Sequence, residues 1–205
     1  MGKIDLSSET DTALIEATNV LESGGVVIFP TDTVYGIGAL PKFSDALARI
    51  YAIKKRPQEM SLPLLLSDMT QVSDCSTFNG QELQTLAKVF WPGPLTLILP
   101  DVLEHMNELL TQNGTVAVRS PDHNFVRGLC AKVGPIAATS ANIHGQPTPL
   151  RISEMPESFD SADLIIDGGE CSYGTASTII ELGNGTPKVI REGPIPEADV
   201  LSALL

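Results

Sequence analysis

The chain has 205 residues, of which 42% are hydrophobic and 19% charged, and its formal net charge is −12. This composition is typical of a folded protein and excludes a disordered one, and no apolar run approaches the ~20 residues of a membrane span. We expect a single domain over residues 1–205, cytoplasmic because its first residues are polar. The acidic balance argues against broad nucleic-acid binding but permits a local basic pocket.

Apolar runs and turn residues alternate along the chain and predict helices and strands. The first helix is expected to start within residues 7–11 and to end at Gly24 and Gly25, and Ser44 is expected to cap the second. Further helices are expected at about 81–90, 124–133 and 196–205. Strands are expected at 26–29, 62–66, 95–99, 115–119, 135–139, 164–166, 177–181 and 188–191. Strands and helices alternate early and strands crowd late, which predicts one α/β layer fold around a mixed sheet.

Hydroxyl, amide and guanidinium side chains gather where several predicted strands end, including a polar loop over residues 31–38. In chain order these residues are Thr31, Thr33, Tyr35, Arg119, Ser140, Asn142 and Arg191. Ligands of open α/β sheets bind outside the carboxyl ends of strands. A single strand-end arginine is usually a surface residue, but this set together indicates a binding site.

Three adjacent basic residues, Lys54, Lys55 and Arg56, stand at the expected end of the second helix, before Pro57. The helix dipole favours cations there, so this stretch alone favours a solvated helix end. Combined with the polar strand ends, it indicates an anion site, for which a polyphosphate is the natural ligand. No P-loop, nucleophile elbow or HExxH motif occurs, so the residues by themselves lead to an anion or nucleotide site without a P-loop.

The histidines and cysteines show no spacing typical of a metal site or a catalytic thiol. We expect all three histidines to be solvated, with His105 facing outward on a helix and His123 and His144 near turns. The cysteines are widely spaced and lack a CxxC pair, which argues against a zinc ribbon and favours buried thiols, Cys130 in the core.

A set of short segments in fixed order covers about residues 10 to 195. The segments are 29–36, 54–57, 91–96, 116–119, 139–142 with 145–147, 177–178 and 190–193. Each is weak alone, but the ordered set resembles the YrdC family of L-threonylcarbamoyladenylate synthases. The resemblance implies a YrdC/RibB-like twisted open mixed sheet with flanking helices and a site on its concave face, in the short single-domain form.

The resemblance implies that the chain makes threonylcarbamoyl-AMP and pyrophosphate from L-threonine, bicarbonate and ATP, for the t6A modification of tRNA. In that reaction the threonine carbamate attacks the α-phosphorus and pyrophosphate leaves, so the enzyme needs no nucleophile of its own and supplies positioning and positive charge. Magnesium would accompany ATP, and no metal site formed by the protein itself is expected. The implied partners are downstream t6A transfer proteins, with only weak contact to tRNA at this net charge.

The resemblance also implies two sets of site residues, and Lys54, Arg56, Ser140 and Asn142 are expected to be catalytic. The ATP-binding set is Lys54, Arg56, Thr115, Ser140, Asn142, Thr148 and Arg191. The threonine-binding set is Thr31, Thr33, Tyr35, Ser67, Arg119, Ala138 and Ser177. One segment departs from the family pattern, because residues 58–64 are longer than usual and Leu62 stands where Asn is common.

Two alternatives stay open from the sequence. The same fold could serve as an RNA-binding module, which the cationic stretch motivates, or as a paralogue that uses another acceptor, which the altered segment after Arg56 motivates. Salt-dependent affinity for tRNA distinguishes the first of these, and an amino-acid screen distinguishes the second.

Overall fold

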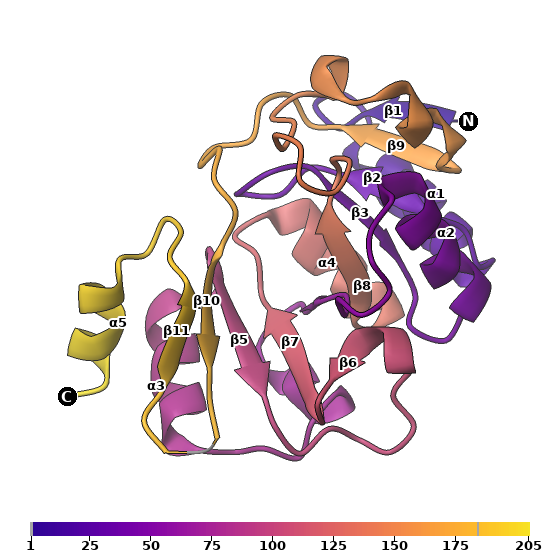
Figure 1. Cartoon of the computed structure of the whole chain (residues 1–205). Helices are drawn as coiled ribbons and strands as arrows, with labels where there is room; N and C mark the ends of the chain where they lie inside the picture. Colours follow the sequence, from indigo (N-terminus) through magenta and orange to yellow (C-terminus); the bar gives the residue numbers. More distant parts are fainter. Residues whose placement is uncertain (1, 184) are drawn as a thin grey trace.

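The computed structural model describes residues 2–183 and 185–205 and arranges them around a mixed sheet of eleven strands (Figure 1). In spatial order the main path is β1 (Gly2–Asp5), β9 (Leu164–Asp167), β2 (Val27–Phe29), β3 (Gly36–Ala39), β8 (Ile136–Ser140), β4 (Leu64–Leu65), β7 (Thr115–Arg119), β5 (Leu95–Leu99), β10 (Thr178–Glu181) and β11 (Lys188–Arg191). β6 (Thr111–Gln112) pairs with β7 outside this path. Parallel and antiparallel pairs alternate irregularly, so the predicted mixed α/β sheet is confirmed.

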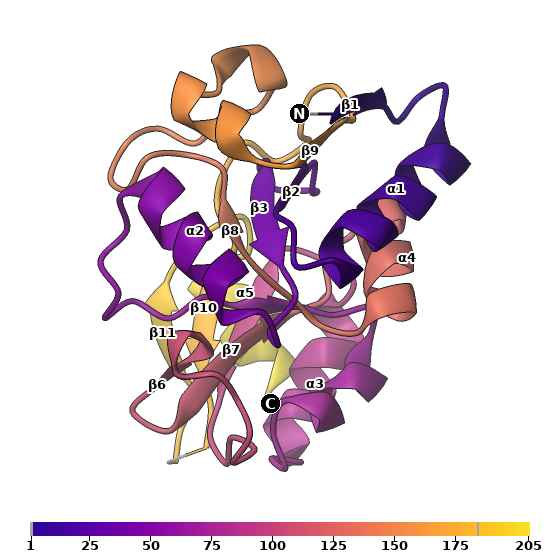
Figure 2. The same cartoon turned by 90° about the vertical axis from the view of Figure 1, so that its right-hand side faces the viewer.

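The helices cover both faces of the sheet. They are α1 (Thr10–Glu22), α2 (Ser44–Lys54), α3 (Gln81–Phe90), α4 (Asn124–Val133) and α5 (Glu197–Ala203). Short 3₁₀ turns occur at Met69–Asp74, Glu108–Leu110, Ile152–Glu154 and Glu157–Ser161. Figure 2 shows α1, α4 and α3 along one side of the sheet and α2 on the other. Within the described ranges, every helix is too short or too polar to span a bilayer.

Side-chain alternation places the core on both faces of the central strands. Along β2, Val27 and Phe29 pack in one apolar cluster with residues of α1 and α4, whereas Ile28 packs in a second cluster with residues of α2. Successive side chains of a strand point to opposite faces, so a strand buried on both sides reads as a continuous apolar run. The run at 26–29 has this pattern.

Most element bounds agree with the sequence pattern, and the departures have local causes. The expected polar loop over 31–38 contains the start of β3, whose Gly36 and Gly38 lack the side chains by which strands are recognised. The expected strand at 62–66 is shortened to β4, because Pro63 has no N–H to donate to a ladder. Ser44 opens α2 instead of capping it; the cap position is Phe43. β1 and β6 were not predicted.

Two glycines give a matched test of the packing. A Cβ at Gly38 would lie 2.9 Å from Ile136 Cγ2 and 3.0 Å from Ala137 O, whereas a Cβ at Gly128, inside α4, would meet nothing within 4 Å. We expect Gly38→Ala to lower the free energy of unfolding by about 1–3 kcal/mol through overpacking. Gly128→Ala is expected to raise it by about 0.5–1 kcal/mol through helix propensity. Urea unfolding checks both; equal effects would contradict the packing of β3 against β8.

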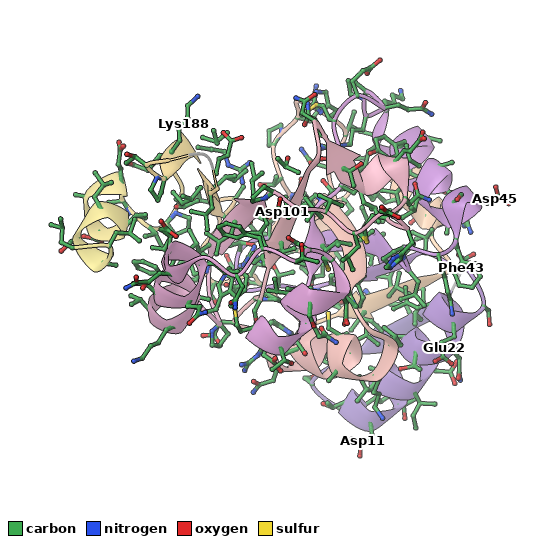
Figure 3. The ribbon with its side chains drawn as sticks, turned by 90° about the horizontal axis from the view of Figure 1, so that it is seen from below. Asp11, Glu22, Phe43, Asp45, Asp101 and Lys188 are labelled. Carbon is green, nitrogen blue, oxygen red and sulfur yellow. The ribbon has the colours of Figure 1, made fainter. Side chains whose placement is uncertain are left out.

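The acidic residues lie largely on the outer surface. Asp11 and Glu22 on α1, Asp45 on α2 and Asp101 after β5 are all exposed, and Figure 3 shows the first three at the edge of the molecule. The charge of −12 is therefore compatible with a basic interior site, because exposed charges are screened over about 10 Å at physiological salt.

Candidate functional site

A cavity of about 310 Å³ lies at the sheet face over β5, β7, β8 and β10 and below the loop that follows β2. Its volume is within the range of small-molecule sites, about 300–1,000 Å³. Of the residues predicted for the site, those that line it are Thr31, Thr33, Tyr35, Arg56, Arg119, Ala138, Ser140, Ser177 and Arg191. Three of its lining residues are arginines, and none within the described ranges is Asp or Glu. The cavity is therefore electropositive in an acidic chain.

The loop after β2 is ordered by a single hydroxyl. Thr31 Oγ1 donates to Val34 O at 2.6 Å and accepts from the backbone N–H groups of Thr33 and Val34. Hydroxyl side chains favour such tight turns after strands. Thr31 thus shapes the loop, and its 3.0 Å contact with Thr33 Oγ1 places the Thr33 hydroxyl beside the cavity.

The Tyr35 side chain lines the cavity, but its hydroxyl points elsewhere. It donates to Gly169 O at 2.8 Å and accepts from Gly168 N at 3.0 Å. Burial raises the pKa of this phenol well above its usual value. Tyr35 therefore ties the loop after β2 to the loop after β9, and its hydroxyl is not free for a ligand as we had expected.

Arg119, the last residue of β7, is buried and held by three different groups. Nε donates to Gly93 O at 3.0 Å, Nη1 donates to Thr33 Oγ1 at 2.9 Å, and Nη2 pairs with Asp32 Oδ1. Burial lowers the pKa of this guanidinium, and the Asp32 charge opposes the change. A guanidinium has five N–H groups, so these three bonds leave two, one on each terminal nitrogen. Two such N–H groups form a fork that suits a carboxylate.

Lys54, the last residue of α2, lies behind the cavity and does not line it. Only 1% of its surface is exposed, and Nζ donates to Ser140 O, to Asn142 O at 2.7 Å and to Asn142 Oδ1 at 3.0 Å. Burial and the nearby charge of Arg56 lower the pKa of the amine to about 7, whereas three oxygen acceptors favour the ammonium. Lys54, expected to hold the phosphates of ATP, is thus a buried anchor for the turn after β8, and its role toward ATP stays a prediction.

The turn after β8 is held by further bonds. Ser140 Oγ donates to Asn142 Oδ1 at 2.6 Å, and Asn142 Nδ2 donates to Gln146 O at 2.6 Å. Ala141 N donates to Tyr35 O at 2.7 Å, which joins this turn to the loop after β2. Ser140 lines the cavity, whereas Asn142 supports it from outside the lining. Together with the bond from Lys54 Nζ to Ser140 O, 86 residues along the chain, these contacts join the end of α2 and the turn after β8 into one unit.

Arg56 lines the cavity mouth beside the segment that departs from the family pattern. Its Nε donates to Met60 O at 3.1 Å and its Nη2 to Ser61 O at 3.0 Å. Burial lowers the pKa of the guanidinium. Met60 and Ser61 also line the cavity, so the longer segment after Arg56 forms part of its wall.

The opposite wall comes from β5, β10 and β11. Ser177 Oγ lies 2.7 Å from Thr96 Oγ1, and Ser177 O accepts from Arg191 Nε at 3.1 Å and Nη2 at 2.7 Å. Burial lowers the pKa of Arg191, and the Arg119 charge adds to this effect. The two arginines therefore face the same space.

Some predicted site residues lie away from the cavity. Ser67 lines a neighbouring cavity, and its hydroxyl donates to Asp68 Oδ2 at 3.2 Å. Thr115 starts β7, at the opposite end from Arg119, and donates to Gln112 O at 2.8 Å. Thr148 does not line the cavity either. For these three residues a ligand role stays a prediction.

Two residues that lie at the site were not predicted from the sequence. Asp32 pairs with Arg119 at the centre of the site, and Thr96 extends the polar wall. Both stand inside segments that carried the resemblance, and Thr96 alternates with Leu95 and Leu97 along β5, a pattern that could have marked it as facing the cavity.

Two histidines are exposed, one is partly exposed, and all three cysteines are buried. His105 is exposed but lies in a turn, not on a helix as expected, and His144 is exposed. His123 is only partly exposed, which corrects the solvated position expected for it; it is the N-cap residue of α4. The cysteines Cys75, Cys130 and Cys171 are buried as predicted.

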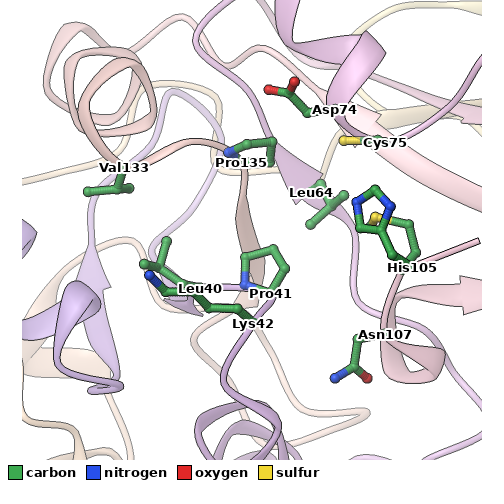
Figure 4. A pocket seen from close by; sticks show the side chains of 11 residues that line it. Leu40, Pro41, Lys42, Leu64, Asp74, Cys75, His105, Asn107, Val133 and Pro135 are labelled. Carbon is green, nitrogen blue, oxygen red and sulfur yellow. The ribbon is translucent and has the colours of Figure 1, made fainter. Parts of the chain in front are cut away.

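A second cavity of about 390 Å³ opens at the other end of β3 and β8 (Figure 4). Leu40, Pro41 and Pro135 form apolar walls, with His105 and Asn107 on one side. None of the predicted site residues lines it, so the first cavity is the candidate for the predicted anion site. In the described part of the chain, no group of three or more His, Cys, Asp or Glu side chains could hold a metal ion.

The open mixed sheet with flanking helices, which carries an arginine-rich cavity, is a YrdC-like fold. Residues 19–193 match the family Sua5_yciO_yrdC, described as "Telomere recombination". The chain therefore belongs to the Sua5/YciO/YrdC family.

Several related proteins and solved structures are similar to this chain. The chain is 37% identical over 199 residues to the threonylcarbamoyl-AMP synthase of Bacillus subtilis, covering 96% of this chain and 58% of the relative. It is 34% identical to the threonylcarbamoyl-AMP synthase of Chromohalobacter salexigens, covering 86% and 96%. The structure of Pyrococcus abyssi Sua5 complexed with L-threonine superposes with a TM-score of 0.91 at 35% identity, covering 99% and 60%. Escherichia coli YciO superposes with a TM-score of 0.80 at 26% identity, covering 94% and 95%.

The chain spans 58% and 55% of the length of the B. subtilis and P. abyssi relatives. The similarity covers the described fold and its cavity. An activity like that of those longer proteins is proposed for this chain below.

Proposed function

We propose that this chain is an L-threonylcarbamoyl-AMP synthase, a nucleotidyltransferase that uses L-threonine, bicarbonate and ATP and releases pyrophosphate for t6A modification of tRNA. The observation that supports this most is the cavity itself, in which Arg56, Arg119 and Arg191 converge without a lining carboxylate. Such a site suits a triphosphate beside an amino acid. We also propose a single YrdC-like domain over residues 1–205, and a cytoplasmic location with the t6A transfer proteins as partners.

Threonine fits the half of the cavity at the end of β7. The fork that Arg119 leaves free receives the substrate carboxylate, and the hydroxyls of Thr33 and Ser177 stand near the amino acid. The small side chain of Ala138 gives room at the cavity floor. This arrangement selects an amino acid with a free carboxylate.

ATP fits the side of the cavity between Arg56, Ser140 and Arg191. The arginines neutralise the phosphates, and the Ser140 hydroxyl lies on the turn that Lys54 anchors. Magnesium enters with ATP as part of the substrate. The threonine carbamate, formed from bicarbonate-derived carbon dioxide, attacks the α-phosphorus; the P–O bond to pyrophosphate breaks and pyrophosphate leaves with the electron pair. The protein side chains position the two substrates and neutralise the phosphate charge, and no protein nucleophile takes part.

The test is pyrophosphate release from purified protein with Mg-ATP, bicarbonate and threonine. We expect release that requires threonine and bicarbonate. Folded protein that releases no threonine-dependent pyrophosphate would refute the synthase. Release with a different amino acid would favour a paralogue, and salt-sensitive tRNA affinity without release would favour an RNA-binding module.

Arg56→Ala tests the phosphate side of the cavity. We expect kcat/KM for ATP to fall about 100-fold, since a charge-assisted contact to phosphate is lost, while the KM for threonine stays within a factor of about three. Arg151→Ala is the matched control, because Arg151 is 57% exposed and pairs only with Glu170 at the surface. Near-normal kinetics with ATP in Arg56→Ala would contradict the role of Arg56.

A further inference from the structure

Three buried polar side-chain atoms within the described ranges have no hydrogen-bond partner: Asp32 Oδ2, His123 Nδ1 and Arg127 Nε. Buried polar atoms are nearly always paired, because an unpaired one costs free energy, so each such atom needs an explanation. These three belong to the loop after β2, to the N-cap of α4 and to α4 itself. Asp32 is bonded to Arg119, and His123 and Arg127 follow Arg119 by four and eight residues in the chain.

Contacts and charges connect the three residues. Arg127 N donates to His123 O at 3.0 Å, so the two residues share the first turn of α4. Asp32 is 5% exposed and pairs with Arg119 through Oδ1, which leaves Oδ2 facing the interior. Burial lowers the pKa of His123, and the Asp32 and Asp122 carboxylates oppose this change while Arg127 reinforces it. Asp32 is therefore close enough to His123 for its charge to act on the imidazole.

We propose that His123 is a positioning residue for Arg119. Its Nδ1–H is linked to Asp32 Oδ2 through one bridging water, and this link fixes the carboxylate that receives Arg119 Nη2. This inference rests on the proposed function only in so far as Arg119 binds the carboxylate of threonine.

The reason that Asp32 needs support lies in the bonds of Arg119. Nε and Nη1 are fixed by Gly93 O and Thr33 Oγ1, and Asp32 fixes the third nitrogen. A substrate carboxylate competes with Asp32 for the same guanidinium. With both oxygens held, Asp32 stays in place and the free N–H fork keeps its direction. With Oδ2 unsupported, the carboxylate rotates and the fork loses its orientation.

The imidazole titration gives a test that is independent of catalysis. The charged groups facing His123 are Asp32 from the loop after β2, Asp122 before α4 and Arg127 on α4. In NMR titrations, with the His123 signal assigned through His105→Gln and His144→Gln, we expect the pKa of His123 to lie below the ordinary value of a histidine. Asp32→Asn removes a charge that favours imidazolium, so it is expected to lower the pKa of His123 further.

An unchanged His123 titration in folded Asp32→Asn would overturn the proposal. If that variant unfolds, the wild-type imidazole decides: a slowly exchanging Nδ1–H with hydrogen-bonded nitrogen shifts supports the pair, and a freely exchanging Nδ1 overturns it.

Steady-state kinetics test whether His123 affects the binding of threonine through Arg119. We expect His123→Phe to raise the KM for threonine about tenfold with the KM for ATP unchanged, and His123→Asn, which keeps a donor, to restore most of the loss. His105→Phe, at an exposed turn, is the control. Equal changes in both KM values, or no rescue by His123→Asn, would indicate a merely structural role. If the wild type shows no threonine-dependent release, the proposed function fails while the titration result stands.

Discussion

Arg119→Lys is expected to lower kcat/KM for threonine about 100-fold. Lysine keeps the positive charge but cannot reproduce a planar fork held by Gly93 O, Thr33 Oγ1 and Asp32 while leaving two N–H groups for a ligand. The loss should fall on threonine, whose carboxylate the fork receives, and much less on ATP. Steady-state pyrophosphate release with each substrate varied in turn measures both.

Arg49→Lys is the matched control for this substitution. Arg49 also pairs with an aspartate, since Nη1 lies 2.9 Å from Asp163 Oδ2, but both side chains are about two-fifths exposed. Surface ion pairs contribute about 0–1 kcal/mol, so little change is expected. Thermal unfolding of each variant separates lost activity from lost structure. A wild-type KM for threonine in folded Arg119→Lys would rule out the carboxylate assignment.

Lys54→Met is expected to reduce both stability and turnover. The substitution keeps an apolar chain of similar length but leaves Ser140 O and Asn142 O without this donor in a buried place, while Asn142 Oδ1 keeps only the bond from Ser140 Oγ. We expect a loss of about 2–4 kcal/mol in the free energy of unfolding from these unsatisfied acceptors. The turn that carries Ser140 would move, and pyrophosphate release is expected to fall at least about 100-fold.

Lys55→Met is the control, because Lys55 is adjacent but exposed, and its left-handed backbone (φ 52°) is equally strained for lysine and methionine. We expect its unfolding in urea and its turnover to match the wild type within error. If Lys54→Met and Lys55→Met behaved alike, Lys54 would not be the anchor that the structure describes.

Lys54 is buried and Lys55 is exposed, a difference that a run of basic residues at a helix end does not predict. Three basic residues at a helix end, followed by Pro57, are typical of a solvated terminus. The run of basic residues does not by itself distinguish Lys54, the last residue of α2, from Lys55, which caps it; only the family resemblance selected Lys54. Only the position of the turn after β8, which comes from strands paired far along the chain, determines which amine is buried.

The elements themselves were largely predictable. The helices at 81–90 and 124–133 and the strands at 95–99 and 115–119 have the expected bounds, because apolar periodicity and flanking Gly or Pro are local signals. The glycine-rich β3 and the short edge strand β1 escaped, because neither carries a side-chain pattern that marks a strand.

The sequence by itself determined the α/β class, most element bounds and the types of side chain at the strand ends, because these depend on neighbours within a few residues. The tertiary structure alone decided that Arg119 bonds to Thr33 and Asp32, that Lys54 is buried beneath Ser140, and that Ser67 and Thr115 stand apart. These contacts follow from strand order and register, which bring together residues more than 80 positions apart. No local preference of the chain encodes that pairing.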